Sequence, residues 1–91
     1  MQRRELENTS TNLDFYPSLK ILARILKVIL EKNSIAKTNL SQESNVNYVK
    51  VLKYLGWLED KRLVEFVIKE GKAHVMLSQK GREFTTSISL L

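Results

Sequence analysis

The 91-residue sequence contains no cysteine and only one histidine, His74. A disulfide-stabilised scaffold and a structural zinc site both need several such residues, so the composition disfavours both, along with cysteine-based redox enzymes. The three glycines stand singly at positions 56, 71 and 81, and the chain therefore lacks a glycine-rich loop for nucleotide phosphates.

Groups able to perform catalysis are equally scarce. His74 has no second histidine or cysteine with which to form a metal site, and we expect it to be an ordinary strand residue. Glu59 and Asp60 are adjacent, so on a helix they point in different directions and are typical of helix-end charges. An active site needs converging acids, bases or nucleophiles. We therefore expect no enzyme activity, no cofactor, no metal and no small-molecule ligand.

Long hydrophobic segments are also missing. The longest apolar-rich stretch, residues 19–30, is interrupted by Lys20, Arg24 and Lys27, whereas a membrane-spanning helix needs roughly 20 mostly uncharged residues. Residues 1–7 show no apolar segment like that of a secretory signal. We expect an intracellular, cytoplasmic protein without a membrane segment.

Basic residues, by contrast, are abundant. Lysine and arginine number 15 against 10 acidic residues, which gives a formal net charge of +5. The excess lies in residues 18–32, with a net charge of +3, and in residues 33–58, with +2. A local positive excess is typical of proteins that bind a polyanion such as a nucleic acid.

The length indicates a single domain, which we place at residues 14–91 after a flexible polar arm at residues 1–13. Residues 18–32 predict a helix with a narrow polar stripe. Its apolar arc is wider than a helix facing one core needs. Two interpretations remain open: this helix is the central one of the domain, or part of it packs against a second copy of the chain.

Two further helices are predicted after a very short strand near residues 35–36. The first is short, about residues 37–43, with Ile35 and Leu40 as its apolar anchors. Asn47 is a good N-cap for the second helix, which we expect over residues 48–61.

The second of these helices shows apolar residues spaced three and four apart. We expect its inward face to consist of Tyr48, Val51, Leu52, Leu55 and Leu58. This orientation places Lys50, Lys53 and Trp57 on the outer side, with Tyr54 on the flank.

The pattern then changes to that of strands. Residues 63–69 are rich in β-branched and aromatic side chains, residues 70–72 form a hairpin tip, and residues 73–77 return as the partner strand. Ser78 caps a final helix in which Phe84, Ile88 and Leu91 share one stripe. The order of elements predicts an α+β, mostly helical, winged helix-turn-helix with a three-helix core, a two-stranded wing and a C-terminal helix.

In such an arrangement the longer helix presents its outer face and N-terminus to the DNA major groove, and the hairpin reaches a neighbouring backbone or minor groove. The side chains that we expect to contact DNA are polar or aromatic: Lys37, Thr38, Gln42, Asn47, Tyr48, Lys50, Lys53, Tyr54, Lys69 and Lys72. The Asn47 amide can pair with adenine, and a lysine can donate to guanine.

Several short segments carry a resemblance to a known family. They are KTNL at 37–40, NVNY at 45–48, KYL at 53–55, Leu58, the pair at 63–64 and LSQKGREF at 77–84. In this order and spacing the chain resembles the small archaeal winged helix-turn-helix DNA-binding family over about residues 19–88. That family includes transcription regulators and chromatin proteins, many of them dimers, in archaea and their viruses. The resemblance implies binding of double-stranded DNA.

The chain departs from the family at two places. Arg62 stands where the family usually has glycine before the first wing strand, and the last helix is too short for the long coiled coil of chromatin-type members. A homodimer would therefore use other surfaces, for which the candidates are Leu19, Ile21, Ile25, Val28, Trp57, Ile88 and Leu91. Three functions remain open: a dimeric transcription regulator that reads an inverted repeat, an architectural DNA binder of low specificity, and a protein-interaction module.

Overall fold

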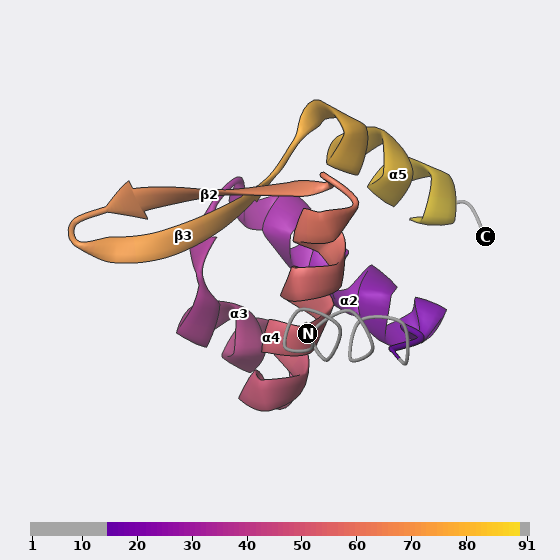
Figure 1. The fold of residues 1–91 in the computed structure, drawn as a ribbon, viewed down its shortest axis with the longest axis horizontal. Helices are drawn as coiled ribbons and strands as arrows, with labels where there is room; N and C mark the ends of the chain where they lie inside the picture. The colour runs from indigo at the N-terminus through magenta and orange to yellow at the C-terminus, as the bar shows by residue number, and fades with distance from the viewer. Residues whose placement is uncertain (1–14, 90–91) are drawn as a thin grey trace, which may run out of the picture.

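A computed structural model describes residues 15–89 (Figure 1). Its elements are α2 (Leu19–Lys32), β1 (Ile35–Ala36), α3 (Lys37–Ser44), α4 (Tyr48–Asp60), β2 (Val64–Lys69), β3 (Lys72–Leu77) and α5 (Gln79–Ser89). The predicted α+β winged helix-turn-helix is confirmed, with a third, two-residue strand added to the wing. The arm expected at residues 1–13 lies outside the described residues.

Helix α2 occupies the centre of the domain. It begins after Ser18, whose Oγ accepts a hydrogen bond from the backbone N–H of Ile21 at 3.4 Å. Four of its aliphatic side chains are buried: Leu22, Ile25, Leu26 and Ile29. The wide apolar arc is thus explained largely by contacts within the domain, since α3, α5 and β3 all pack on this helix. Only Leu19 and Leu30 remain exposed at its two ends.

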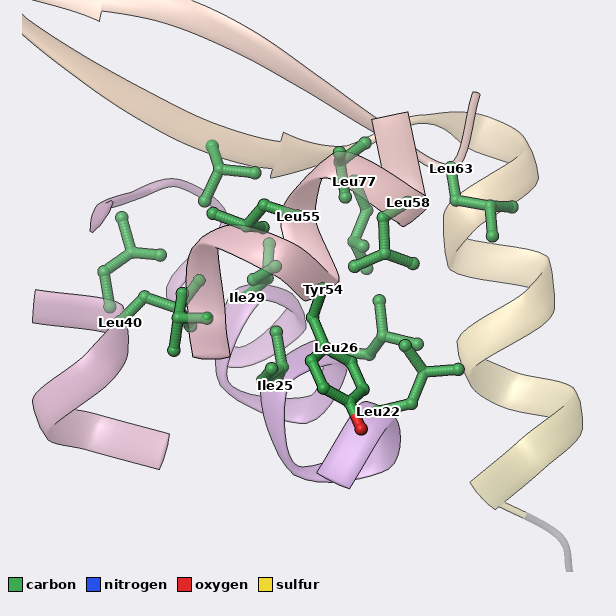
Figure 2. Packing of buried hydrophobic residues seen from close by; sticks show 14 of the residues in the cluster. Leu22, Ile25, Leu26, Ile29, Leu40, Tyr54, Leu55, Leu58, Leu63 and Leu77 are labelled. Carbon is green, nitrogen blue, oxygen red and sulfur yellow. The ribbon is translucent and has the colours of Figure 1, made fainter. Parts of the chain in front are cut away.

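The core forms where α2 and α4 face each other, closed by Leu40 of α3, by Leu63 in the connection before β2 and by Leu77 of β3 (Figure 2). The tightly buried side chains of α4 are Val51, Tyr54, Leu55 and Leu58. Burying this many aliphatic and aromatic groups, each worth about 1.5–3 kcal/mol, is the main source of stability in a domain of this size.

The orientation of α4 differs from the sequence-based expectation. Tyr48 and Leu52 were expected to face inward, but each is 40% exposed, whereas Tyr54, expected on the flank, is 4% exposed. The segment before α2 accounts for the difference. The Tyr54 hydroxyl accepts a hydrogen bond from the backbone N–H of Ser18 at 2.8 Å, and the Phe15 ring packs edge-on against the Tyr54 ring at 5.0 Å.

The three strands form an antiparallel sheet in the order β1-β3-β2. Val64 pairs with Leu77 at the base of the β2–β3 hairpin, and Lys69 pairs with Lys72 at its tip. Glu70 and Gly71, with φ values of 52° and 77°, form a two-residue turn in the left-handed region that suits the twist of a hairpin. The distal half of this hairpin extends beyond the helices as a wing (Figure 1).

The junction between α4, the wing and α5 contains a left-handed residue, Arg62, and a tight backbone contact at Gly81. Arg62 lies in the α4–β2 connection with φ 62°, in the left-handed region where glycine is favoured. Gly81, in the first turn of α5, lies against the backbone carbonyl of Leu63, so closely that a Cβ at residue 81 would overlap it. The Ser78 hydroxyl donates to the Arg62 carbonyl at 2.8 Å and accepts from the Gly81 N–H at 2.9 Å. The expected cap at Ser78 is confirmed.

Candidate nucleic-acid interface

The turn between α3 and α4 is held by hydrogen bonds of its own residues. Asn45 adopts the left-handed conformation, with φ 58°, and ends α3. The Val46 N–H donates to the Ser41 carbonyl at 3.1 Å, and the Ser41 hydroxyl donates to the Val46 carbonyl at 2.6 Å. Val46 itself is buried beneath the turn. The relative position of the two helices is therefore fixed from both sides of the connection.

A side chain from α2 completes this turn. The Arg24 guanidinium donates from Nε and Nη2 to the Ser44 carbonyl, and from Nη2 to the Asn45 carbonyl at 2.8 Å. These carbonyls stand at the C-terminal end of α3, where a helix has unpaired acceptors and a partial negative charge. The sequence had shown Arg24 only as part of the polar stripe of α2, because the partner of a surface arginine cannot be inferred from helical spacing.

The N-terminus of α4 is capped as expected. The side-chain Oδ1 of Asn47 accepts from the backbone N–H groups of Val49, at 2.8 Å, and Lys50, at 3.2 Å. Because both bonds use the amide oxygen, the amide NH₂ is the part of Asn47 that is left to donate to a ligand. The expected pairing with adenine needs an acceptor and a donor together, and the cap therefore works against it.

The outer face of α4 exposes both basic and apolar side chains. Lys50 and Lys53 lie in solvent, as expected, and Tyr48 is exposed beside them. Val49, 63% exposed, and Leu52 lie on the same side. Neither residue was expected to contact DNA: the spacing of Leu52 had assigned it to the inward face, and Val49 had been assigned to neither face.

Two of the aromatic residues of α4, Tyr54 and Trp57, do not lie on this face. Tyr54 was expected to contact DNA, and that prediction is wrong, because the side chain is buried against α2 and its hydroxyl is hydrogen-bonded to Ser18. Trp57 was expected to point outward, but it is half-buried against the core, with the Lys61 ammonium 5.6 Å from its ring centroid.

The candidate residues of α3 take different positions. Thr38 and Gln42 are exposed, so their hydroxyl and amide groups are accessible. Lys37 is half-buried at the start of α3, and its ammonium lies 4.8 Å from the centroid of the Phe66 ring of β2. This cation–π contact connects the helix-turn-helix to the base of the wing.

The wing carries the remaining candidates at its tip. Lys69 and Lys72 are exposed and face each other across the hairpin. The Lys69 ammonium donates to the Ser34 hydroxyl at 2.8 Å. Ile68, 72% exposed, stands next to Lys69 and was not selected from the sequence. His74 is half-buried in β3, with Nδ1 3.2 Å from the Lys72 carbonyl, as expected for a strand residue.

The residues proposed for a dimer interface differ in how much of their surface the domain leaves exposed. The prediction that Ile25 lies in a dimer interface is wrong, because this side chain is completely buried in the core of its own domain. Leu19 is exposed at the start of α2. Four others, Ile21, Val28, Trp57 and Ile88, are partly buried against the core. Leu91 lies outside the described residues.

Within residues 15–89, no group of three acidic or histidine side chains is placed to hold a metal ion. None of the helices in that part of the chain is both long and apolar enough to cross a membrane.

The sequence profile of a family described as winged helix-turn-helix matches residues 17–91. None of the curated proteins matches the chain. Among solved structures, the DNA-binding protein Sso10a-2 from Sulfolobus solfataricus superimposes with a TM-score of 0.71 at 20% identity, over 81% of this chain and 76% of that one.

Two solved transcriptional regulators are similar as well. A MarR family regulator from Silicibacter pomeroyi gives a TM-score of 0.72 at 19% identity, over 79% of this chain and 49% of that one. The regulator BldR from Sulfolobus solfataricus gives 0.69 at 19% identity, over 77% and 52%. The chain thus spans about half the length of these two regulators. At such identities the similarity shows a shared fold.

Proposed function

The chain belongs to the winged helix-turn-helix family, and from this premise we propose that it is a DNA-binding regulator of transcription. Helix α4 enters the major groove, and the wing formed by β2 and β3 meets the neighbouring backbone or minor groove. Thr38 and Gln42 of α3 contact phosphates and set the register on the duplex.

The observation that carries this proposal is the outer face of α4. It presents Lys50 and Lys53 in solvent, and no acidic residue occurs between Ser44 and Leu58. The capped N-terminus of the same helix adds a partial positive charge. The whole face therefore attracts a polyanion, and a helix of this diameter fits a groove about 12 Å wide.

We propose further that the chain acts as a homodimer on an inverted repeat. Leu19 is exposed on α2, and Ile21, Val28 and Ile88 keep part of their apolar surface uncovered. Pairing through part of this apolar surface would bring together two chains of charge +5 each. Two-fold symmetry would then place the two copies of α4 on half-sites about 34 Å apart.

A second candidate function is an architectural DNA binder with little sequence preference. It is favoured by the similarity to Sso10a-2, which matches over most of its own length and is described as a DNA-binding protein rather than as a regulator. The two candidates share the same interface and differ in sequence discrimination.

The test is the salt dependence of binding to double-stranded DNA by the full chain. Each phosphate contact should contribute about −0.9 to the slope of log K against log salt. Lys50→Ala and Lys53→Ala should each weaken binding, and either change should reduce the slope by about 0.9 if that lysine meets a phosphate. Lys80→Ala is a matched control, because Lys80 is an exposed lysine of α5, and α5 lies apart from α3 and from the N-terminal half of α4 (Figure 1).

Absence of salt-sensitive binding at low ionic strength would contradict both candidate functions. Selection of bound sequences from a random pool separates them, since regulators discriminate by roughly 10³-fold or more. Sedimentation tests the dimer: a species of 10.6 kDa at every concentration would refute it.

A further inference from the structure

The residues of α4 that point farthest from the core form one stripe. Val49, Leu52, Lys53 and Gly56 are exposed and are spaced three, four and seven residues apart, so they lie on one side of the helix. They are opposite to Val51, Leu55 and Leu58, which are buried. We call these four residues the outer stripe.

The aliphatic members of the outer stripe have no evident role in the stability of the domain. Val49 is 63% and Leu52 40% exposed, and neither belongs to the buried core. The solvent face of a helix in a globular protein is normally polar. Two adjacent aliphatic groups at the centre of the candidate interface are therefore explained by a contact outside the domain.

Gly56 supports the same conclusion independently. Glycine is a poorer helix former than alanine, and here it stands in the interior of α4. A Cβ at this position would meet nothing within 4 Å, so no neighbour in the domain requires its absence. A missing side chain in the middle of an exposed helix is expected where another surface approaches the backbone closely.

The chemistry of the partner follows from what surrounds the outer stripe. Lys50 flanks it and Lys53 belongs to it, so the partner carries negative charge close to an apolar group. The major groove of DNA offers both, because phosphates line it and the 5-methyl group of thymine is the apolar group on its floor. The Asn47 oxygen is engaged by backbone N–H groups, which takes away the most direct means of reading adenine.

We propose that the outer stripe reads thymine, with Val49 and Leu52 contacting 5-methyl groups in the major groove and Gly56 allowing the second half of α4 to approach the duplex. This inference rests on the proposed DNA-binding function and adds its base preference. Thymines in the binding site should face the first two turns of α4.

The experiment uses the full chain and the sequence that it selects from a random DNA pool. Each thymine of that site is replaced in turn by deoxyuridine, which removes one methyl group and keeps the base pair intact. Binding should weaken by about fourfold for each methyl that contacts the outer stripe. At those positions, 5-methylcytosine should bind better than cytosine, because it restores the methyl group.

Two variants identify the residues responsible. Val49→Ala should weaken binding to the thymine site and make the thymine and uracil sites equivalent at one position, as a double-mutant cycle would show. Since Val49 is exposed, the variant should fold normally, which thermal unfolding checks. Gly56→Ala should raise the unfolding temperature and weaken DNA binding by about tenfold, because the added methyl group lies in the contact.

The possible results distinguish a failure of thymine reading from a failure of the proposed DNA binding. Salt-sensitive binding with no preferred site, or with no uracil-sensitive position, overturns thymine reading and leaves the proposed DNA binding in place. An unchanged ratio of thymine to uracil affinity in Val49→Ala also overturns it, and a protein partner would then be the explanation for the apolar stripe. Loss of all salt-sensitive binding refutes the proposed function itself.

Discussion

The Arg24 side chain of α2 holds the Ser44 carbonyl of α3 with two hydrogen bonds, 3.2 Å from Nε and 2.9 Å from Nη2. An exposed side chain of the central helix thereby acts on the turn that precedes α4. The contact is a charge-assisted one at a helix C-terminus, where the carbonyls have no partner within the helix. The position of the α4 N-terminus thus depends on a side chain some twenty residues earlier.

Replacing Arg24 by methionine should therefore act on the helix-turn-helix without removing a DNA contact. We expect the free energy of unfolding to fall by about 1–2 kcal/mol and DNA affinity to fall with an unchanged salt slope. Arg24→Lys keeps the charge but loses the paired geometry, and should be intermediate. A decrease of about 0.9 in the slope would instead mean that Arg24 meets a phosphate.

Arg62→Gly should stabilise the protein. Arg62 has φ 62°, a conformation that costs about 1 kcal/mol or more for residues with a Cβ and little for glycine. We expect urea denaturation to show a gain of about 1 kcal/mol, reduced somewhat by the greater freedom of glycine in the unfolded chain. Arg62→Ala, which keeps the Cβ, should show no such gain, and equal effects of both changes would disprove a conformational origin.

Gly81→Ala should instead destabilise the protein. The new methyl group would overlap the Leu63 backbone and lie 2.9 Å from its carbonyl carbon, so α5 or the start of β2 must move. Overpacking of this kind costs about 1–3 kcal/mol, measurable by thermal or urea unfolding. The matched change is Gly56→Ala, in open space on α4, which should stabilise by about 1 kcal/mol. If both variants lost a similar amount of stability, the expected difference between the two glycines would be refuted.

The two tyrosines of α4 should respond differently to loss of the hydroxyl. Tyr54→Phe leaves the Ser18 N–H without its acceptor and should reduce stability by about 1 kcal/mol, with DNA affinity unchanged. Tyr48→Phe, at an exposed position, should leave stability unchanged and affect only DNA binding. Weaker DNA binding by folded Tyr54→Phe would show that the anchoring of α4, rather than direct contact, matters there.

Element order, the short β1 strand, the N-cap at Asn47 and the hairpin were predictable, because each depends on residues near to one another in the chain. The rotation of α4 was not. Tyr48 is three residues from Val51, and Tyr54 is three residues from Val51 and four from Leu58, so periodicity allows either tyrosine to be inside. The choice is made by Phe15 and Ser18, which approach from a distant part of the sequence.

The same limit applies to the candidate site. Lys50 and Lys53 were correctly expected in solvent, because charged residues rarely enter a core. Leu52 was missed because its spacing with the other apolar residues of the helix assigned it to the buried side. Val49 lies outside that pattern, and a single aliphatic residue does not indicate what it contacts. The roles of Arg24 and Gly81 depend on backbone carbonyls of other elements, and these leave no pattern in the sequence.

The pairing of β1 with β3 has a consequence for the duplex itself. Ala36 ends β1 and is at the same time the N-cap of α3, so the sheet continues into the helix-turn-helix without a loop between them. The separation between α4 and the base of the wing is therefore fixed before any DNA is bound. A duplex that does not already match this separation must bend or change its groove width to meet α4 and the wing together. Base steps between the two contacts would then be selected for deformability, at positions that no side chain touches.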